Sequence, residues 1–195
     1  TEKDLTEDEL PQVNTYKYKQ VIFVGDSRTE FMENVLKGMG NTAIKDVKFV
    51  CSAGQGLNWL SSTGWTELYS IIKNDTNSIL SKKTAVIFNF GVNDLTKYKK
   101  YAEYYNWMAP QLISKGCELY FMSVNPLNRL MLPNAGRSDR SEAAVRTFNK
   151  YMQSNLDSAY NYIDMYSYLK STGYSFASDH YGTGSIDDGL HYTTR

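Results

Sequence analysis

Short apolar runs alternate along the chain with segments of helical periodicity. The runs are rich in Val, Ile and Phe, which is typical of strands that are buried on both faces. Between them, apolar residues recur at helical spacing, as in Trp65, Leu68 and Ile72. Parallel strands need crossover connections, which are usually helices. We therefore expect an α/β fold, a flavodoxin-like three-layer α/β/α sandwich around a central five-stranded parallel sheet. The strands are predicted at Val21–Val24, Val47–Cys51, Ala85–Phe90, Glu118–Val124 and about Tyr162–Met165, and further helices around Tyr101–Leu112 and Ala144–Leu156.

The first predicted strand runs into the tripeptide Gly25-Asp26-Ser27. A serine hydroxyl is a poor nucleophile at neutral pH, so it needs a base to take its proton and an acidic group to orient that base. The chain has two histidines, His180 and His191, and only His191 has an aspartate, Asp188, three residues upstream. We predict that Ser27 is a nucleophile, His191 its base and Asp188 the group that orients the base.

Acyl transfer also needs hydrogen-bond donors aimed at the oxyanion of the transition state. The predicted strand Ala85–Phe90 runs into a turn that contains Asn93, which places this amide at a strand's C-terminal end. The strand Val47–Cys51 opens into a segment with two glycines, where the backbone can approach a ligand closely. We predict Asn93 and the Gly56 N–H as donors, with Gly54 as the alternative to Gly56.

Four blocks of the chain resemble, in the same order, the sequence blocks of the SGNH/GDSL hydrolase family. They are Gly25-Asp26-Ser27, the glycine after the second strand, Gly91-Val92-Asn93-Asp94 and Asp188-Gly189-Leu190-His191. The resemblance extends from about Gln20 to Thr193. It implies that Ser27 is both the nucleophile and the first oxyanion donor through its own N–H. It also implies that Gly56 and Asn93 complete the oxyanion hole, that Asp188 and His191 complete the triad, and that no cofactor is needed.

The chain departs from the family pattern beside the nucleophile and in the second block. Arg28 stands where a leucine is common, and we expect it either to hold an anionic or hydroxyl-rich part of the substrate or to form a surface ion pair. Cys51 or Ser52 stands where the family usually has an asparagine before its glycine, which is why Gly54 stays an alternative.

Aromatic residues near the motifs are candidates for substrate contact, because flat amphipathic rings can stack on sugar faces. Trp59 follows Gly56 closely and Tyr192 follows His191, so both are predicted to touch substrate, with plain packing as the alternative. The segment Asn125–Asp139 is expected to be a loop beside the site. There, Asn125 and Arg129 either touch substrate or lie at a solvated loop tip.

Acidic residues around the motifs have other interpretations. We expect Asp26 to cap backbone groups and Asp94 to tie down its own loop rather than act chemically. A metal site is a weaker alternative to the triad, because carboxylates and histidines do bind divalent ions. The residues that such a site would draw on are Asp179, His180, Asp187, Asp188 and His191.

The composition fits one enzyme domain. The chain has 195 residues, 42% of them hydrophobic, which is enough to bury a single core. It carries 21 basic and 21 acidic residues, so a nucleic-acid partner is disfavoured. No apolar run approaches the ~18 residues that a membrane span requires. Cys51 and Cys117 lie on strands that we do not expect to be neighbours, so both are predicted to be free buried thiols.

The chain begins without a methionine and reaches Pro11 before any predicted strand. We expect residues 1–14 to be a linker or processed N-terminal extension and residues 15–195 to be the hydrolase domain. An extracellular or cell-surface location is expected, with the cytoplasm as the alternative.

These observations lead to one functional prediction. We expect a serine esterase that hydrolyses short-chain acyl esters, acetyl esters above all, on a small molecule or glycan through a covalent acyl-enzyme. The alternatives are an O-acyltransferase that acts on a cell-wall glycan and a non-catalytic glycan-binding module on the same fold.

Overall fold

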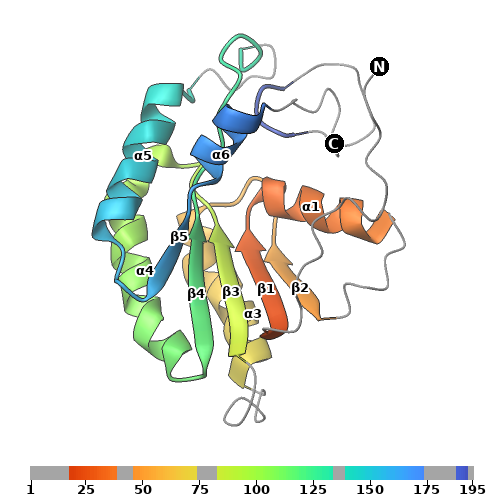
Figure 1. Cartoon of the computed structure of the whole chain (residues 1–195), viewed down its shortest axis with the longest axis vertical. Helices are drawn as coiled ribbons and strands as arrows, with labels where there is room; N and C mark the ends of the chain where they lie inside the picture. The colour runs from red at the N-terminus through yellow and green to blue at the C-terminus, as the bar shows by residue number, and fades with distance from the viewer. Residues whose placement is uncertain (1–17, 39–45, 74–82, 134–138, 174–187, 193–195) are drawn as a thin grey trace.

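The computed structural model describes residues 18–38, 46–73, 83–133, 139–173 and 188–192. Its centre is a parallel five-stranded sheet with the strand order β2-β1-β3-β4-β5 (Figure 1). The predicted α/β fold with a central five-stranded parallel sheet is therefore confirmed. The predicted extension, residues 1–14, lies outside the described residues. The strands are β1 (Tyr18–Gly25), β2 (Val47–Cys51), β3 (Lys83–Asn89), β4 (Cys117–Met122) and β5 (Tyr160–Ile163).

Helices flank the sheet, because each parallel connection must cross from one strand end back to the other. In Figure 1, α1 lies on the near side of the sheet and α3 on the far side. Helix α4 packs against β4 and against α5. None of the helices in the described ranges is long and apolar enough to cross a membrane. The helical elements are α1 (Ser27–Gly38), α2 (Leu57–Trp59), η3 (Leu60–Gly64), α3 (Trp65–Lys73), η4 (Leu95–Lys97), α4 (Tyr98–Ile113), α5 (Glu142–Asn155) and α6 (Met165–Thr172).

Strand β5 begins and ends earlier in the chain than predicted. The early end is explained by Asp164, whose side chain accepts a hydrogen bond of 3.0 Å from the Ser167 N–H. Such a cap satisfies a backbone donor that has no partner inside the helix, so it favours the start of α6 directly after β5. The apolar residue Met165, predicted as the end of a strand, is therefore the first residue of a helix.

Large aromatic side chains fill the core between the sheet and α4. Phe88 of β3 lies edge-on to Tyr105 of α4, with ring centroids 5.0 Å apart. Tyr105 also lies edge-on to Phe121 of β4, at 5.4 Å. All three side chains are fully buried, and burial of one such ring contributes about 1.5–3 kcal/mol. Tyr105 therefore serves packing rather than recognition.

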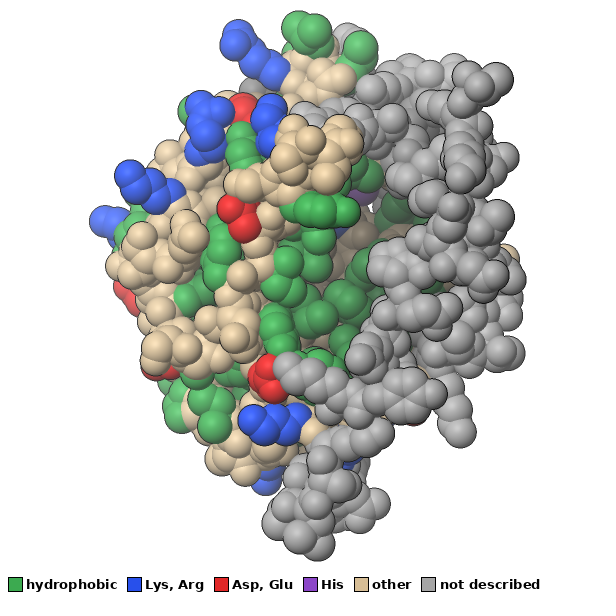
Figure 2. All heavy atoms as spheres, viewed as in Figure 1, with side chains coloured by type: hydrophobic (Ala, Val, Ile, Leu, Met, Phe, Trp, Pro, Cys, Tyr) green, Lys and Arg blue, Asp and Glu red, His purple; other side chains and the backbone are tan. Residues whose placement is uncertain are grey.

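The near face of the sheet carries a row of half-buried apolar residues in adjacent registers. Phe49, Phe23, Ile87 and Tyr120 lie side by side across β2, β1, β3 and β4. The rings of Phe23 and Phe49 stack with centroids 5.6 Å apart. Figure 2 shows hydrophobic side chains gathered in the middle of this face, while several Lys and Arg side chains lie towards its margin.

Candidate active site

The sequence motifs meet at one edge of the sheet. Ser27 follows β1, Gly56 lies beyond β2, and Asn93 lies beyond β3. The C-terminal ends of parallel strands lie at the same edge, which is where ligands of open α/β sheets usually bind. His191, 164 residues after Ser27, also reaches this edge, and its Nε2 is 2.8 Å from the Ser27 Oγ.

Asp188 stabilises the loop that carries His191. Its Oδ1 accepts hydrogen bonds of 2.9 Å from the backbone N–H groups of Leu190 and His191, and its Oδ2 is 2.5 Å from His191 Nδ1. Partial burial alone would raise the pKa of Asp188, but the bonds from the His191 ring and from the two N–H groups outweigh it. The pKa of Asp188 is therefore well below its usual value, and the carboxylate is available to orient the imidazole.

Ser27 is the first residue of α1 and is 5% exposed. Backbone N–H groups in the first turn of a helix have no intrahelical acceptor, and the helix dipole favours negative charge there. Asp26 caps this turn, because its Oδ1 accepts a hydrogen bond of 3.1 Å from the Arg28 N–H. The expected capping role of Asp26 is therefore confirmed.

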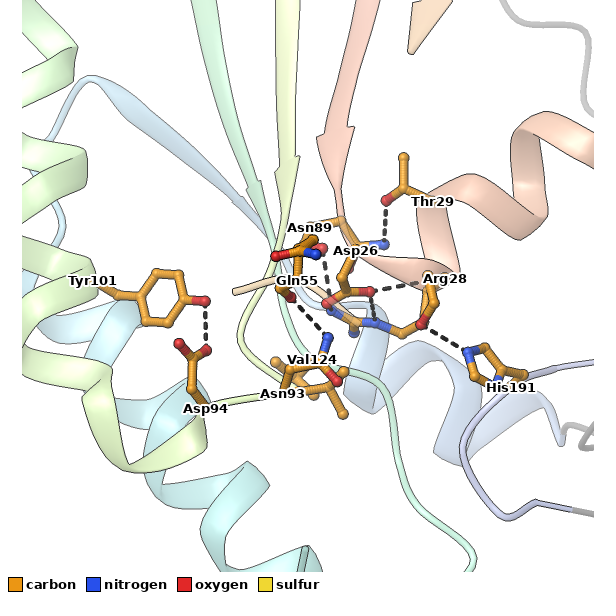
Figure 3. A network of polar contacts seen from close by, with 12 residues as sticks. Asp26, Arg28, Thr29, Gln55, Asn89, Asn93, Asp94, Tyr101, Val124 and His191 are labelled. Atoms are coloured by element: carbon orange, nitrogen blue, oxygen red, sulfur yellow. Dashed lines mark hydrogen bonds and ion pairs between the residues drawn. The ribbon is translucent and has the colours of Figure 1, made fainter. Parts of the chain in front are cut away.

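Arg28 lies inside the protein rather than on its surface. Its Nε and Nη2 donate to the two oxygens of Asp26 at 2.9 and 2.8 Å, and Nη2 also donates to the Asn89 carbonyl at 3.1 Å (Figure 3). The side chains of Arg28 and Asp26 are 5% and 0% exposed. The alternative that placed Arg28 in a surface ion pair is therefore wrong, because the pair that it forms is buried.

The side-chain amide of Asn93 is held from both ends. Its Nδ2 donates a hydrogen bond of 2.8 Å to the Gln55 carbonyl (Figure 3). Its Oδ1 accepts a hydrogen bond of 2.9 Å from Arg140 Nη2. A primary amide carries two N–H groups, and the bond to Gln55 uses one of them. The second N–H of Asn93 can therefore serve an oxyanion.

Gly56 and Gly54 have different surroundings. A Cβ atom added to Gly56 would lie 2.5 Å from the Asp94 Oδ2, so a larger residue here would displace this carboxylate. Gly54 is exposed, has a φ of +73° and has nothing within 4 Å of its would-be Cβ atom. Gly56 thus lies against the loop that carries Asn93, whereas Gly54 belongs to an exposed turn.

Asp94 ties down its own loop, as expected. Its Oδ1 accepts a hydrogen bond of 2.6 Å from the Tyr101 hydroxyl, and Lys97 Nζ lies 3.3 Å from its Oδ2. Burial, followed by the charge of Asp94, raises the pKa of Tyr101 far above its usual value, so this hydroxyl stays a donor.

The predicted substrate contacts occupy varied positions. The Trp59 ring packs against Phe90, with centroids 6.0 Å apart, and against Gly64. The Tyr192 hydroxyl donates a hydrogen bond of 2.7 Å to the Pro126 carbonyl. Asn125 is half-buried and Arg129 is exposed. Packing and loop contacts thus account for part of the surfaces of Trp59 and Tyr192, and their contact with substrate stays a prediction.

A pocket of about 390 Å³ lies beside the second block, between α2, η3 and α4. It contains exposed aromatic surface, since Trp107 is 50% exposed and stacks on Tyr104 with centroids 5.3 Å apart. Leu57, the residue after Gly56, also lines it. The full lining is Leu57, Asn58, Ser61, Lys100, Glu103, Tyr104 and Trp107.

Among the described residues, no group of three or more His, Cys, Asp or Glu side chains is arranged to bind a metal ion. Asp179, His180 and Asp187, on which the metal alternative relied, lie outside the described residues. Cys51 and Cys117 are free, as predicted; Cys117 is buried, but Cys51 is only half-buried.

Sequence reasoning missed two residues that support the site. Arg140 and Gln55 form hydrogen bonds with the Asn93 amide. Arg140 is 47 residues from Asn93, and no motif around it indicates this contact. Tyr101 was recognised only as part of an amphipathic helix. Tyr101 lies seven residues after Asp94, and this spacing is the one local signal that could have suggested the bond.

Solved structures share this architecture. A candidate SGNH hydrolase from Slackia heliotrinireducens is 11% identical and aligns over 90% of this chain and 91% of its own, with a TM-score of 0.60. The fold is that of the SGNH hydrolases. An acetyl xylan esterase with this fold aligns at 14% identity over 89% of this chain and 91% of its own, with a TM-score of 0.54.

A third structure with a similar fold is the C-terminal catalytic domain of peptidoglycan O-acetyltransferase A (OatA) from Streptococcus pneumoniae, in a methylsulfonyl adduct. It aligns at 15% identity over 91% of this chain and 82% of its own, with a TM-score of 0.50. No protein-family model and no curated protein sequence matches the chain. The similarity is therefore one of fold.

Proposed function

We propose that this protein is a serine ester hydrolase that removes short-chain acyl groups, acetyl groups above all, from a carbohydrate. The observation that carries the proposal is the contact of 2.8 Å between Ser27 Oγ and His191 Nε2. Asp188 meets the other ring nitrogen of His191. A nucleophile, a base in reach of it and a carboxylate that orients the base are the parts that covalent ester hydrolysis needs.

The reaction proceeds in two halves. Ser27 Oγ attacks the ester carbonyl while His191 Nε2 takes the serine proton, and the tetrahedral intermediate collapses as His191 returns that proton to the leaving alcohol. Water then attacks the acyl group on Ser27, with His191 again taking a proton, and the acid leaves as the proton returns to Ser27. The carboxylate of Asp188 stabilises the imidazolium at both stages.

Three groups are assigned to the oxyanion. They are the backbone N–H of Ser27 at the start of α1, the N–H of Gly56 and the second side-chain N–H of Asn93. The helix position of Ser27 supports the first, and the bond from Asn93 to Gln55, which leaves one amide N–H over, supports the third. Loss of one such donor typically lowers kcat by about 100- to 1000-fold.

Two observations support an acylated carbohydrate as the substrate. SGNH-fold neighbours include an acetyl xylan esterase and a peptidoglycan O-acetyltransferase domain. The pocket lined by Trp107 and Tyr104 offers exposed aromatic surface next to hydrogen-bonding side chains, which suits a sugar ring. Because such acylated polymers lie outside cells, we also propose an extracellular or cell-surface location.

Two comparisons test the substrate. Hydrolysis of p-nitrophenyl acetate is expected to be much faster than hydrolysis of the octanoyl ester, and the reverse order would overturn the assignment of a small acyl group. Trp107→Ala is expected to raise KM for an acetylated oligosaccharide and to leave p-nitrophenyl acetate hydrolysis unchanged. If Trp107→Ala affects both substrates equally, or affects neither, this pocket does not bind the substrate.

The second candidate function is O-acyl transfer to a glycan hydroxyl, which the similarity to the OatA domain favours. Water and a sugar hydroxyl compete for the same acyl-enzyme, so the two functions share every residue named above. Incubation with an acetyl donor and candidate glycan acceptors, followed by mass spectrometry, separates them. Acetylated glycan as the main product would replace hydrolysis by transfer.

A further inference from the structure

Arg140 uses its guanidinium group to bind the segment that carries the proposed oxyanion donor. Its Nε donates a hydrogen bond of 2.9 Å to the Val92 carbonyl, and its Nη2 donates one of 2.9 Å to Asn93 Oδ1. Its Nη1 lies 3.5 Å from the Asp139 carboxylate. The side chain is only 16% exposed. The planar guanidinium group thus binds both the Val92 backbone carbonyl and the Asn93 side chain.

These contacts fix the orientation of the Asn93 side-chain amide. A guanidinium group only donates hydrogen bonds, so it selects the amide oxygen, and the Gln55 carbonyl only accepts, so it selects the amide nitrogen. A flipped amide would set oxygen against the Gln55 carbonyl and N–H against Arg140. It would also place an acceptor where the oxyanion needs a donor. Both partners therefore favour the one orientation that is useful for catalysis.

We propose that Arg140 is the positioning residue of the oxyanion hole and acts on the reaction through Asn93. The inference deepens the proposed function and rests on it for its effect on turnover. Arg140 has two roles here: it fixes the direction of the Asn93 N–H, and its permanent charge polarises the amide whose N–H meets the developing oxyanion. Both roles act mainly in the transition state.

The position of Arg140 is itself well fixed. The next residue, Ser141, caps helix α5, because its Oγ accepts a hydrogen bond of 3.1 Å from the Ala144 N–H. Glu142, the first residue of α5, accepts a hydrogen bond of 3.0 Å from the Leu127 N–H. Arg140 therefore projects from the anchored start of a helix, which suits a group that must hold another side chain still.

The kinetic test uses Arg140→Met, Arg140→Lys, Asn93→Ala and the double variant Arg140→Met/Asn93→Ala. Arg140→Met is expected to lower kcat for p-nitrophenyl acetate by about 10- to 100-fold with little change in KM, less than the full loss of a donor. Arg140→Lys keeps the charge but lacks the planar guanidinium group that reaches both the Val92 carbonyl and Asn93 Oδ1. Its kcat should therefore lie between those of Arg140→Met and the native protein. Lys150→Met, which removes an exposed cation from α5, should leave kcat unchanged.

The double variant separates positioning from a general structural role. If Arg140 acts through Asn93, Arg140→Met lowers kcat by less than about 2-fold once Asn93 is alanine. A loss of the same size in both backgrounds would overturn the proposal. The proposal would also be overturned if Arg140→Met and Arg140→Lys lost the same fraction of kcat and both had a lower Tm.

A measurement without turnover keeps the proposal testable if no ester is cleaved. In protein labelled with ¹⁵N-asparagine, the Asn93 side-chain amide is identified by its absence in Asn93→Ala. Its proton and nitrogen shifts should move or broaden in Arg140→Met and stay in place in Lys150→Met. Unchanged Asn93 shifts in Arg140→Met would refute the positioning role. If the native protein is inactive but the Asn93 shifts change in Arg140→Met, the proposed function is refuted and the positioning role of Arg140 stands.

Discussion

The carboxylate of Asp94 accepts a hydrogen bond of 3.0 Å from the backbone N–H of Leu57, 37 residues earlier in the chain. This bond ties the loop after β3, which carries Asn93, to the loop after β2, which carries Gly56. The other Asp94 oxygen accepts the Tyr101 hydroxyl of α4. One side chain thus fixes the relative position of two proposed oxyanion donors.

Replacement of Asp94 by alanine should therefore cost both stability and activity. Asp94→Ala leaves the Leu57 N–H and the Tyr101 hydroxyl without their acceptor, so we expect a loss of about 1–3 kcal/mol in the free energy of unfolding, together with a lower kcat. Tyr101→Phe removes one bond only and should cost about 1 kcal/mol with a smaller effect on kcat. Urea unfolding and ester hydrolysis measure both. Equal effects of the two variants on kcat would contradict the role of the Leu57 bond.

Asp188 should contribute to stability in a pH-dependent way. Its pKa is lowered in the folded protein, so its contribution is present above its unfolded pKa of about 3.9 and is lost as the pH falls towards the lower folded value. The stability difference between the native protein and Asp188→Asn should be constant above about pH 5 and shrink below about pH 4. Urea unfolding from pH 3 to pH 7 tests this, and a constant difference down to pH 3 would contradict it.

Asp188→Asn should also reduce turnover, because an amide no longer stabilises the imidazolium form of His191. We expect kcat to fall by about 10³- to 10⁴-fold at neutral pH, by analogy with the loss of the acid in other serine triads. Single-turnover measurements should show the same fall in the acylation step. A loss below about 10-fold would show that Asp188 does not orient the base.

Arg28 is expected to matter for folding. Removal of one partner of a buried ion pair leaves the other charge uncompensated, at a cost of about 3–5 kcal/mol. Arg28→Ala should therefore lower Tm strongly, and Arg28→Ala/Asp26→Asn should regain part of the loss because no unpaired carboxylate is left. If Arg28→Ala instead changes only KM and leaves Tm as it was, the side chain binds substrate and the assigned role is wrong.

The Cys51 thiol should react slowly. Partial burial, followed by the negative charge of Glu33 and a contact of 3.5 Å with its carboxylate, raises the pKa of Cys51 to about 12. The thiolate is the reactive form, so at pH 9 iodoacetamide should alkylate Cys51 far more slowly than a free cysteine of ordinary pKa. Glu33→Gln should accelerate alkylation, and Cys51→Ser identifies the labelled residue by mass spectrometry. Alkylation at the rate of a free thiol would refute the raised pKa.

The sequence predicts the parts of this protein that depend on local patterns. Strands such as Val47–Cys51 were predicted at their observed positions because β-branched and aromatic residues form a short run bounded by turns. Ser27 and His191 could be paired because so few residues can do their chemistry. The boundary at β5 was wrong because a single cap, Asp164, outweighed the apolar pattern.

Contacts between distant segments were not predictable in the same way. Nothing near Arg140 in the sequence indicates that it meets Asn93, and nothing near Asp94 indicates Leu57. The Arg28 side chain points inward to Asp26 and to the Asn89 carbonyl, and only the folded structure shows these contacts. The supporting contacts of the site therefore emerged from the structure, while the pairing of Ser27 with His191 could be predicted from motifs.

The measurement that tests the account most directly is hydrolysis of p-nitrophenyl acetate by the native protein and by Ser27→Ala, at neutral pH with a metal chelator present. We predict that the native protein is active under these conditions and that kcat/KM falls by about 10³-fold or more in the variant. Equal activity of the two proteins, or activity that the chelator abolishes, would contradict a serine esterase built on Ser27 and His191.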